Sequence, residues 1–330
     1  MRIELLDPAA AAERDLREWY DCRVVIARFD SPADPDLPFD LVRGQLEPDG
    51  PQRRRTWVCR DAVGSVLGGV RLALPDDENR HTCDSVVTVH PHARRRGVGR
   101  ALLERAVREA RAQGRRSMTG AAEVGSPGAA FATRLGASGK LHDTRSLLRL
   151  TDIDPATMAG LAAGETSQTT GYTLVRWRVR CPDALVESYS RGLAAMNDAP
   201  LGALDHLPVR FDPARVRRYE AARAVRGQRL HVVCAQETNT GEIAGLTELF
   251  VRTEGPRADQ GDTAVLAAHR GRGLGLWVKA TMLSWLLAER PEVTEVETWN
   301  ATANAHMRAV NARLGYLPIE EWVNYQLALS

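Results

Sequence analysis

The amino-acid sequence of 330 residues predicts an α+β fold with two similar domains, each a mostly antiparallel central sheet flanked by helices. Two repeated patterns support this prediction. The motif Arg-x-x-Gly-x-Gly occurs at 94–99 and at 270–275, each time between an apolar extended run and an amphipathic helical pattern. The tripeptide Arg-Leu-Gly occurs at 134–136 and at 313–315. The offsets of 176 residues (94 to 270) and 179 residues (134 to 313) are nearly equal, which indicates a duplicated domain.

In the first half, strands are predicted where apolar extended runs lie between turn residues, and helices where apolar residues recur every three or four positions. The clearest helix follows the first glycine turn, because Leu102, Ala106 and Ala110 repeat at helical spacing and Gly114 stands at a C-cap position. The other predicted elements are strands at 2–6, 55–60, 66–74, 86–89 and 146–150, helices at 9–20 and 129–135, and polar loops at 31–38 and 75–84.

The second half repeats this order. A stripe of apolar residues marks the helix after the second glycine turn, and Pro291 ends it. The other predicted elements are strands at 172–179, 230–235, 243–252, 263–267, 293–299 and 322–329, and helices at 184–196, 213–225 and 303–314. Residues 154–171 contain a proline, three glycines and a Ser/Thr cluster without periodicity, which is typical of a linker. The sequence therefore predicts an N-terminal domain at 1–153, this linker, and a C-terminal domain at 172–330.

The composition excludes several classes of function. A net charge of +2 gives no electrostatic reason to expect nucleic-acid or membrane binding. The five cysteines are widely spaced, without a Cys-x-x-Cys pair, so neither a disulfide framework nor a metal site is predicted. No apolar run reaches membrane length, and the start of the chain has no signal-peptide pattern. We therefore expect a cytoplasmic, metal-free protein that is a monomer or a homodimer.

An apolar strand followed by a basic glycine turn and a helix forms a site for an anion. Glycines let the bare backbone approach a ligand, and the first N–H groups of a helix have no partner within it. A diphosphate suits such a turn. The dinucleotide fingerprint is excluded because Leu102 and Val278 stand where its third glycine should be. A nucleotide P-loop is excluded because neither Lys140 nor Lys279 lies in the required glycine context.

The two glycine turns resemble the acetyl-CoA-binding motif of the GNAT superfamily of N-acetyltransferases, once in each half. The second half also resembles the family at 293–299, at Asn304 and at 314–316, and the tandem architecture is similar to that of mycothiol synthase. The resemblance implies two tandem GNAT-like domains and acetyl-CoA as co-substrate. The residues implied to bind it are Val87, Thr88, Val89, Arg94, Arg95, Arg96, Gly97, Val98, Gly99 and Arg100 in the first half, and Val265, Leu266, Ala267, Arg270, Gly271, Arg272, Gly273, Leu274, Gly275 and Asn304 in the second.

The resemblance also suggests where the catalytic groups lie. GNAT enzymes take a general base, usually a glutamate acting through water, from the strands beside the motif, where this chain has Glu248 and Asp262. The alternative is that Glu248 lies on the solvated face of a half-buried strand. Many GNAT enzymes have a tyrosine general acid at a position where this chain has Asn311 in the second half and Ala132 in the first. Asn311 can donate a hydrogen bond to the leaving sulfur, but it cannot deliver a proton.

These differences favour catalysis in the C-terminal domain. In the first half, the sequence at 125–128 is unfavourable for a helix start, so the N-terminal domain is expected to bind CoA without turnover or only to complete the fold. Asp198 and Asp205 lie where the family places acceptor loops, and they suit a cationic amine or belong to an ordinary polar turn. The expected activity is acetyl transfer from acetyl-CoA to the primary amine of a small molecule in a ternary complex. The alternative is a non-catalytic acyl-CoA-binding or scaffold protein with degenerate sites.

Overall fold

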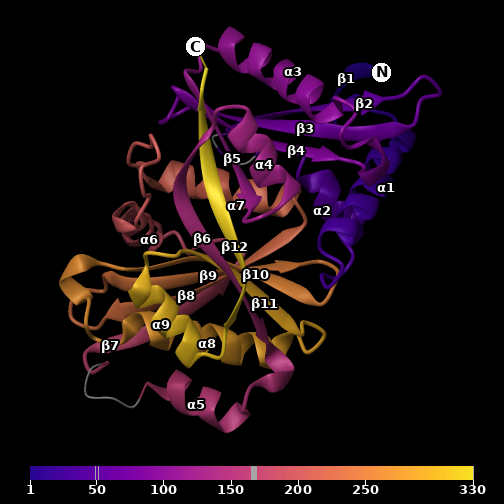
Figure 1. Cartoon of the computed structure of the whole chain (residues 1–330). Helices are drawn as coiled ribbons and strands as arrows, with labels where there is room; N and C mark the ends of the chain where they lie inside the picture. Colours follow the sequence, from indigo (N-terminus) through magenta and orange to yellow (C-terminus); the bar gives the residue numbers. More distant parts are fainter. Residues whose placement is uncertain (49, 51, 165–168, 330) are drawn as a thin grey trace.

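The computed structural model describes residues 1–48, 50, 52–164 and 169–329. Within these residues the strands form one sheet of twelve, in the order β1-β2-β3-β4-β5-β12-β6-β11-β10-β9-β8-β7 (Figure 1). The pairs β4–β5 and β10–β11 are parallel, and the other neighbouring strands of the sheet are antiparallel. The predicted α+β class and the repeated order of elements are confirmed.

Apart from α5, which opens the second half, the elements of the two halves follow the same sequence of strands and helices. The first half contains β1 (Arg2–Leu6), α1 (Glu13–Asp30), α2 (Phe39–Gly44), β2 (Gln52–Arg60), β3 (Val66–Pro75), β4 (Thr82–Val89), α3 (Val98–Ala112), β5 (Ser117–Glu123), α4 (Pro127–Arg134) and β6 (Ser138–Arg149). The second half contains α5 (Pro155–Ala163), β7 (Tyr172–Arg178), α6 (Val186–Ala194), α7 (Pro213–Val225), β8 (Gln228–Glu237), β9 (Ile243–Arg252), β10 (Arg257–Val265), α8 (Leu274–Glu289), β11 (Glu295–Ala301), α9 (Ala305–Arg313) and β12 (Leu317–Ala328).

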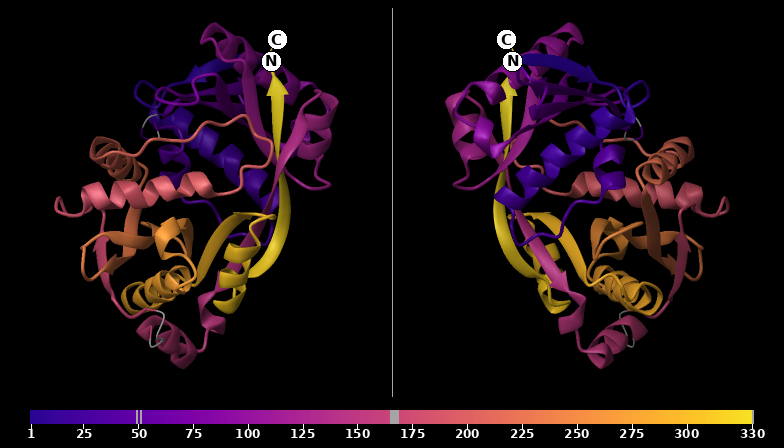
Figure 2. Two further views of the ribbon diagram at one scale, coloured as in Figure 1. Left: turned by 90° about the vertical axis from the view of Figure 1, so that its left-hand side faces the viewer. Right: turned by 90° about the vertical axis from the view of Figure 1, so that its right-hand side faces the viewer.

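The last strand of each half is exchanged with the other half. Strand β12 of the second half pairs with β5 of the first half, next to the parallel pair β4–β5. Strand β6 of the first half pairs with β11 of the second half, next to the parallel pair β10–β11. The two exchanged strands, β12 and β6, also pair with each other. In Figures 1 and 2, β12 runs from the C-terminal half to the top of the N-terminal half. Each strand is twelve residues long, rather than the short strands at 146–150 and 322–329 that the sequence predicts. The two halves therefore share one continuous sheet.

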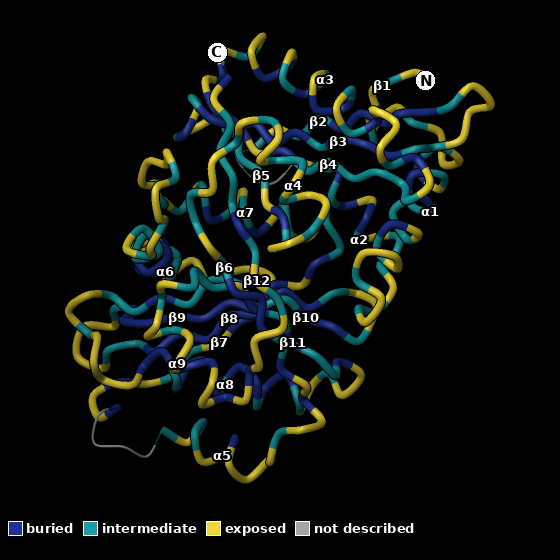
Figure 3. The backbone as a smooth tube through the Cα atoms, viewed as in Figure 1, coloured by how far each residue is buried: buried dark blue, intermediate teal, exposed yellow. Residues whose placement is uncertain are grey.

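Helices cover both faces of this sheet. In the second half, α8 packs on one face over a core that includes Val278 and Leu283, while α6 packs on the other face around Tyr189 and Leu193. The first half repeats this arrangement with α3 and α1. Figure 3 shows the buried positions concentrated along the strands and on the inner sides of these helices. Burying a large apolar side chain contributes about 1.5–3 kcal/mol, so these layers contribute strongly to the stability of the fold.

Three local predictions are corrected by contacts that a sequence pattern does not show. Residues 155–163 of the predicted linker form α5, which begins after an Asp154 N-cap. This helix packs on α8, where Trp277 Nε1 donates a hydrogen bond to the Ala162 carbonyl (2.9 Å). Residues 165–168 of the predicted linker lie outside the described residues. Strand β5 was not predicted. The stretch at 125–128 does start a helix, because the Ser126 hydroxyl accepts from the N–H of Ala129 and Pro127 occupies the first turn.

Candidate active site

Both glycine turns have the backbone shape that an anion site requires. Gly97 and Gly273 adopt left-handed φ angles of 82° and 71° and are the N-cap residues of α3 and α8. No side chain among the described residues caps either helix, so the first N–H groups remain available to a ligand. A Cβ atom at Gly97 or at Gly271 would meet no atom within 4 Å, so the space over both turns is open. This geometry fits a diphosphate held by backbone N–H groups.

The first arginine of each motif ties its turn to two other segments. Arg94 Nε donates to the carbonyl of the last residue of β4 (3.0 Å), and its guanidinium pairs with Asp30 at the end of α1 (2.7 Å). Arg270 Nε donates to the carbonyl of the last residue of β10 (3.1 Å), and its guanidinium pairs with Asp198 between α6 and α7. Asp198 is therefore engaged with the turn, which leaves it less able to recognise an acceptor amine.

The other residues predicted to bind the cofactor lie around these turns. Asn304 caps α9, since its Oδ1 accepts from the N–H of Met307 (3.1 Å). Arg100 pairs with Glu104 on α3 (2.9 Å). The remaining predicted residues lie in β4 (Val87, Thr88, Val89), at the end of β10 and just beyond it (Val265, Leu266, Ala267), on the exposed turns (Arg95, Arg96, Gly271, Arg272), and in the first turns of the two helices (Val98, Gly99, Leu274, Gly275).

The strands that lead into the two turns differ. In both halves parallel pairing lasts for three residues, up to Asp84 in β4 and up to Asp259 in β10, and then the neighbouring strands separate. Strand β10 has a bulge at 260–263 in its pairing with β9, whereas the pairing of β4 with β3 is regular. A bulge removes backbone groups from the hydrogen-bonding pattern of the two strands. The second half therefore has backbone N–H groups, near the point where β10 and β11 separate, that can stabilise an oxyanion.

Glu248 is fully buried on β9, beneath α6 and α7. Its carboxylate accepts one hydrogen bond from the hydroxyl of Tyr189 on α6 and another from the hydroxyl of Tyr219 on α7 (2.9 Å). Its exposed fraction is 0%. The alternative that Glu248 lies on the solvated face of its strand is therefore wrong. Sequence analysis did not identify the two tyrosines, because they are 59 and 29 residues away along the chain.

Asp262 lies at the β10 bulge, next to Glu248, and is partly exposed. Burial raises the pKa of Glu248 to about 7, and the neighbouring negative charge of Asp262 adds to this shift; the two tyrosine hydroxyls oppose it. Burial also raises the pKa of Asp262, which the positive charge of Arg223 partly offsets. A carboxyl group that ionises near neutral pH is suited to general-base catalysis.

The first half lacks this carboxylate pair. By strand register, the residue of β3 equivalent to Glu248 is Arg71, so a cation stands where the second half has an acid. Asp84 is equivalent to Asp259, before the bulge, so Asp262 has no counterpart. The resemblance between the halves therefore extends to the glycine turns and ends at the candidate catalytic groups.

Asn311 and Lys279 lie on the opposite face of the sheet, with α8 and α9. Asn311 is buried, and its Nδ2 donates to Asn300 Oδ1 on β11 (2.6 Å). Lys279 is 1% exposed; its amine lies 4.9 Å from the centre of the Tyr316 ring, and the described residues provide it no carboxylate partner. Burial lowers the pKa of Lys279 to about 7. A buried amine without a counter-ion is costly to fold.

We expect Lys279→Met to stabilise the protein at pH 7, by on the order of 2–4 kcal/mol, because each pKa unit corresponds to about 1.4 kcal/mol. The folded-state pKa of Lys279 lies below its ordinary value, so the unfolded chain binds the proton more tightly than the folded protein. The buried amine therefore lowers the free energy of unfolding most below pH 7. Urea denaturation at pH 7 and at pH 10 measures the effect. The difference in the free energy of unfolding between variant and wild type should be smaller at pH 10 than at pH 7. A variant that is less stable than the wild type at pH 7 would contradict the prediction.

Metal-binding clusters and membrane-spanning helices are both absent from the described residues. No group of three or more His, Cys, Asp or Glu side chains in that part of the chain is placed to hold a metal ion. None of the helices described is both long enough and apolar enough to cross a membrane.

Comparisons with known proteins identify the family. The model of the GNAT acetyltransferase family matches residues 14–137 and, separately, residues 201–316. A tandem GNAT protein from the clavulanic acid biosynthesis pathway is 31% identical, with a TM-score of 0.83 over 100% of this chain and 98% of that one. The chain therefore belongs to the GNAT family of acetyltransferases, with two tandem GNAT domains.

More distant structures share the fold. A GCN5-related N-acetyltransferase from Sphaerobacter thermophilus matches 99% of this chain and 95% of its own, at 15% identity and a TM-score of 0.69. A structure described as a putative acetyltransferase from Pyrococcus horikoshii matches 99% and 89%, at 13% identity and a TM-score of 0.57. The search of curated proteins gave no match.

Proposed function

We propose that the C-terminal half transfers an acetyl group from acetyl-CoA to the primary amine of a small molecule, by direct transfer in a ternary complex. The observation that carries this proposal is the buried Glu248, paired with Asp262 at the bulge of the strand that leads into an open glycine turn. The first half has such a turn without the bulge and without either carboxylate.

The residues of the C-terminal half have distinct roles in this proposal. Acetyl-CoA supplies an acetyl thioester when it is bound with its diphosphate at the second glycine turn. Glu248, through the partly exposed Asp262 beside it, accepts the proton that the acceptor ammonium must lose before its nitrogen can attack the thioester carbon. Backbone N–H groups at the bulge stabilise the oxyanion that forms. Asn311 donates a hydrogen bond to the sulfur through its second Nδ2 hydrogen. As the carbon–sulfur bond breaks, the departing thiolate takes up the second proton, which the nitrogen loses when the amide forms.

We also propose that the N-terminal half binds acyl-CoA without turnover. Its glycine turn has the same left-handed geometry and the same uncapped helix as the second turn. Arg71, however, stands where the second half has Glu248, so this half lacks that general base.

Calorimetric titration with acetyl-CoA tests both assignments. We expect a stoichiometry of two and release of free thiol when a suitable amine is added. Thiol release is measured against a panel of amines that includes peptides. Absence of binding at millimolar acetyl-CoA would contradict the proposal, and a stoichiometry of one would restrict binding to a single half.

The second candidate is a non-catalytic acyl-CoA-binding protein. One observation favours it: neither half has a tyrosine at the position of the general acid, and Nδ2 of Asn311 is already hydrogen-bonded to Asn300. A thiol pKa is only modestly above neutral, so departure of the thiolate without a general acid is still feasible. Binding of acetyl-CoA with no thiol release across the whole amine panel would support this candidate over the enzyme.

A further inference from the structure

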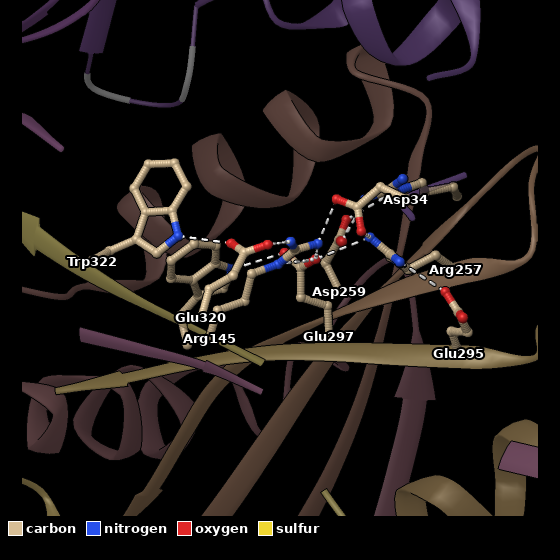
Figure 4. Close-up of polar contacts among 10 residues, drawn as sticks. Asp34, Arg145, Arg257, Asp259, Glu295, Glu297, Glu320 and Trp322 are labelled. Carbon is tan, nitrogen blue, oxygen red and sulfur yellow. Dashed lines mark hydrogen bonds and ion pairs between the residues drawn. The ribbon is translucent and has the colours of Figure 1, made fainter. Parts of the chain in front are cut away.

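The segment between α1 and α2 of the first half reaches into the second half. Asp34, in this segment, lies between two buried arginines, Arg145 on β6 and Arg257 on β10 (Figure 4). The distances from its carboxylate to the two guanidinium groups are 2.7 and 3.0 Å. The side chains of the two arginines are only 5% and 4% exposed, so removal of a carboxylate partner there is costly.

These contacts lie at the base of the proposed catalytic strands. Arg257 is the first residue of β10, and it also binds Glu295 and Glu297 on β11 (2.8 and 3.2 Å). The parallel pairing of β10 with β11 consists of residues 257–259. The bulge and the separation of the two strands follow immediately. Asp34 of the first half therefore helps to fix the strand pair from which the candidate active site of the second half is built.

The other end of the same segment contacts the glycine turn of its own half. Asp30, the last residue of α1, pairs with Arg94, the first residue of the first motif (2.7 Å). Only three residues separate Asp30 from Asp34. A short piece of backbone thus joins the first glycine turn to the base of β10 in the other half.

The same connection is repeated in the opposite direction. Asp198 pairs with Arg270 of the second motif, and Asp205 lies 3.1 Å from Nε2 of His81, at the base of β4. By the same strand register, the residue of β4 equivalent to Arg257 is Thr82, and His81 directly precedes it. This second link is the weaker one, because it ends at one histidine rather than at two buried arginines, and Asp205 is 61% exposed.

We propose that the N-terminal half is an acyl-CoA sensor: acyl-CoA bound at its glycine turn changes the affinity of the C-terminal half for acyl-CoA through Asp30 and Asp34. This inference rests on the proposed binding of acyl-CoA by both halves. A diphosphate at the first turn brings negative charge next to Arg94 and competes with Asp30 for its guanidinium. A shift of Asp30 is passed to Asp34, and from there to Arg257 and the β10–β11 pair. Coupling of this kind is typically at least fivefold and is reciprocal between the two sites.

Calorimetry with acetyl-CoA on matched variants tests the coupling. Gly97→Val isolates binding to the second half, and Gly273→Val isolates binding to the first. In the wild type, the product of the two binding constants should differ at least fivefold from the product of the two isolated constants. The same comparison is then made with Asp34→Asn present in all three proteins: alone, with Gly97→Val and with Gly273→Val. The two products of binding constants should then differ by less than twofold. Asp36→Asn is the control. Among the described residues Asp36 pairs only with Arg28, on the surface, so this variant should leave the coupling unchanged.

A second variant protects this test against a loss of folding. Asp30→Asn breaks the link at its more exposed end, away from the two buried arginines, and should abolish the coupling in the same way. Coupling that persists in both variants, or wild-type sites that bind independently, would overturn the proposal. Failure of the proposed function is distinguishable, because a Gly97→Val protein would then bind no acetyl-CoA at all.

Discussion

Gly273→Val is expected to lower kcat/KM for acetyl transfer by about 100-fold or more, while Gly97→Val changes it by less than about tenfold. A branched side chain at the second turn lies over the backbone N–H groups that we propose bind the diphosphate. Loss of two charge-assisted hydrogen bonds costs about 3 kcal/mol or more, and about 1.4 kcal/mol corresponds to a factor of ten. Steady-state thiol release at varied acetyl-CoA measures the effect.

The two variants control for each other. Both glycines have left-handed φ angles, 71° and 82°, so valine imposes a similar backbone strain of about 1–3 kcal/mol at either position. Thermal melting should therefore show similar shifts for the two proteins. If Gly97→Val loses turnover and Gly273→Val keeps it, the active site belongs to the N-terminal half.

Glu248→Gln is expected to reduce turnover about 100- to 10,000-fold at pH 8, the usual contribution of a general base, and to reduce it much less at pH 6. The pKa of Glu248 is about 7, so its carboxylate is about one-tenth ionised at pH 6 and nine-tenths ionised at pH 8. The wild-type rate should therefore rise roughly tenfold between these two pH values through this group. The variant should lose this rise. Rate measurements from pH 5.5 to 8.5 give both profiles.

Asp262→Asn tests the origin of this pKa. Removal of the neighbouring negative charge should lower the pKa of Glu248 and move the midpoint of the profile to lower pH. An unchanged midpoint would mean that burial alone sets the pKa. A Glu248→Gln enzyme with the wild-type rate at pH 8 would remove Glu248 from the mechanism.

Parts of the candidate site were predictable because they depend on short stretches of chain. The left-handed geometry at Gly97 and Gly273 and the helices that follow are consequences of local sterics and of a helical period within about twenty residues. The same holds for α7 and β9, whose predicted bounds agree with the structure. Because the motif is repeated, each prediction made for one half also applied to the other.

The sequence by itself thus determined the α+β class, the tandem arrangement and the two glycine turns. Only the tertiary structure decided which strand pairs with which, that Glu248 is buried between two tyrosines, and that Asp34 lies between Arg145 and Arg257. The physical reason is the range of the forces involved. Backbone sterics and periodicity act between near neighbours, whereas desolvation, ion pairing and strand exchange depend on segments that lie from 29 to more than 111 residues apart in the chain.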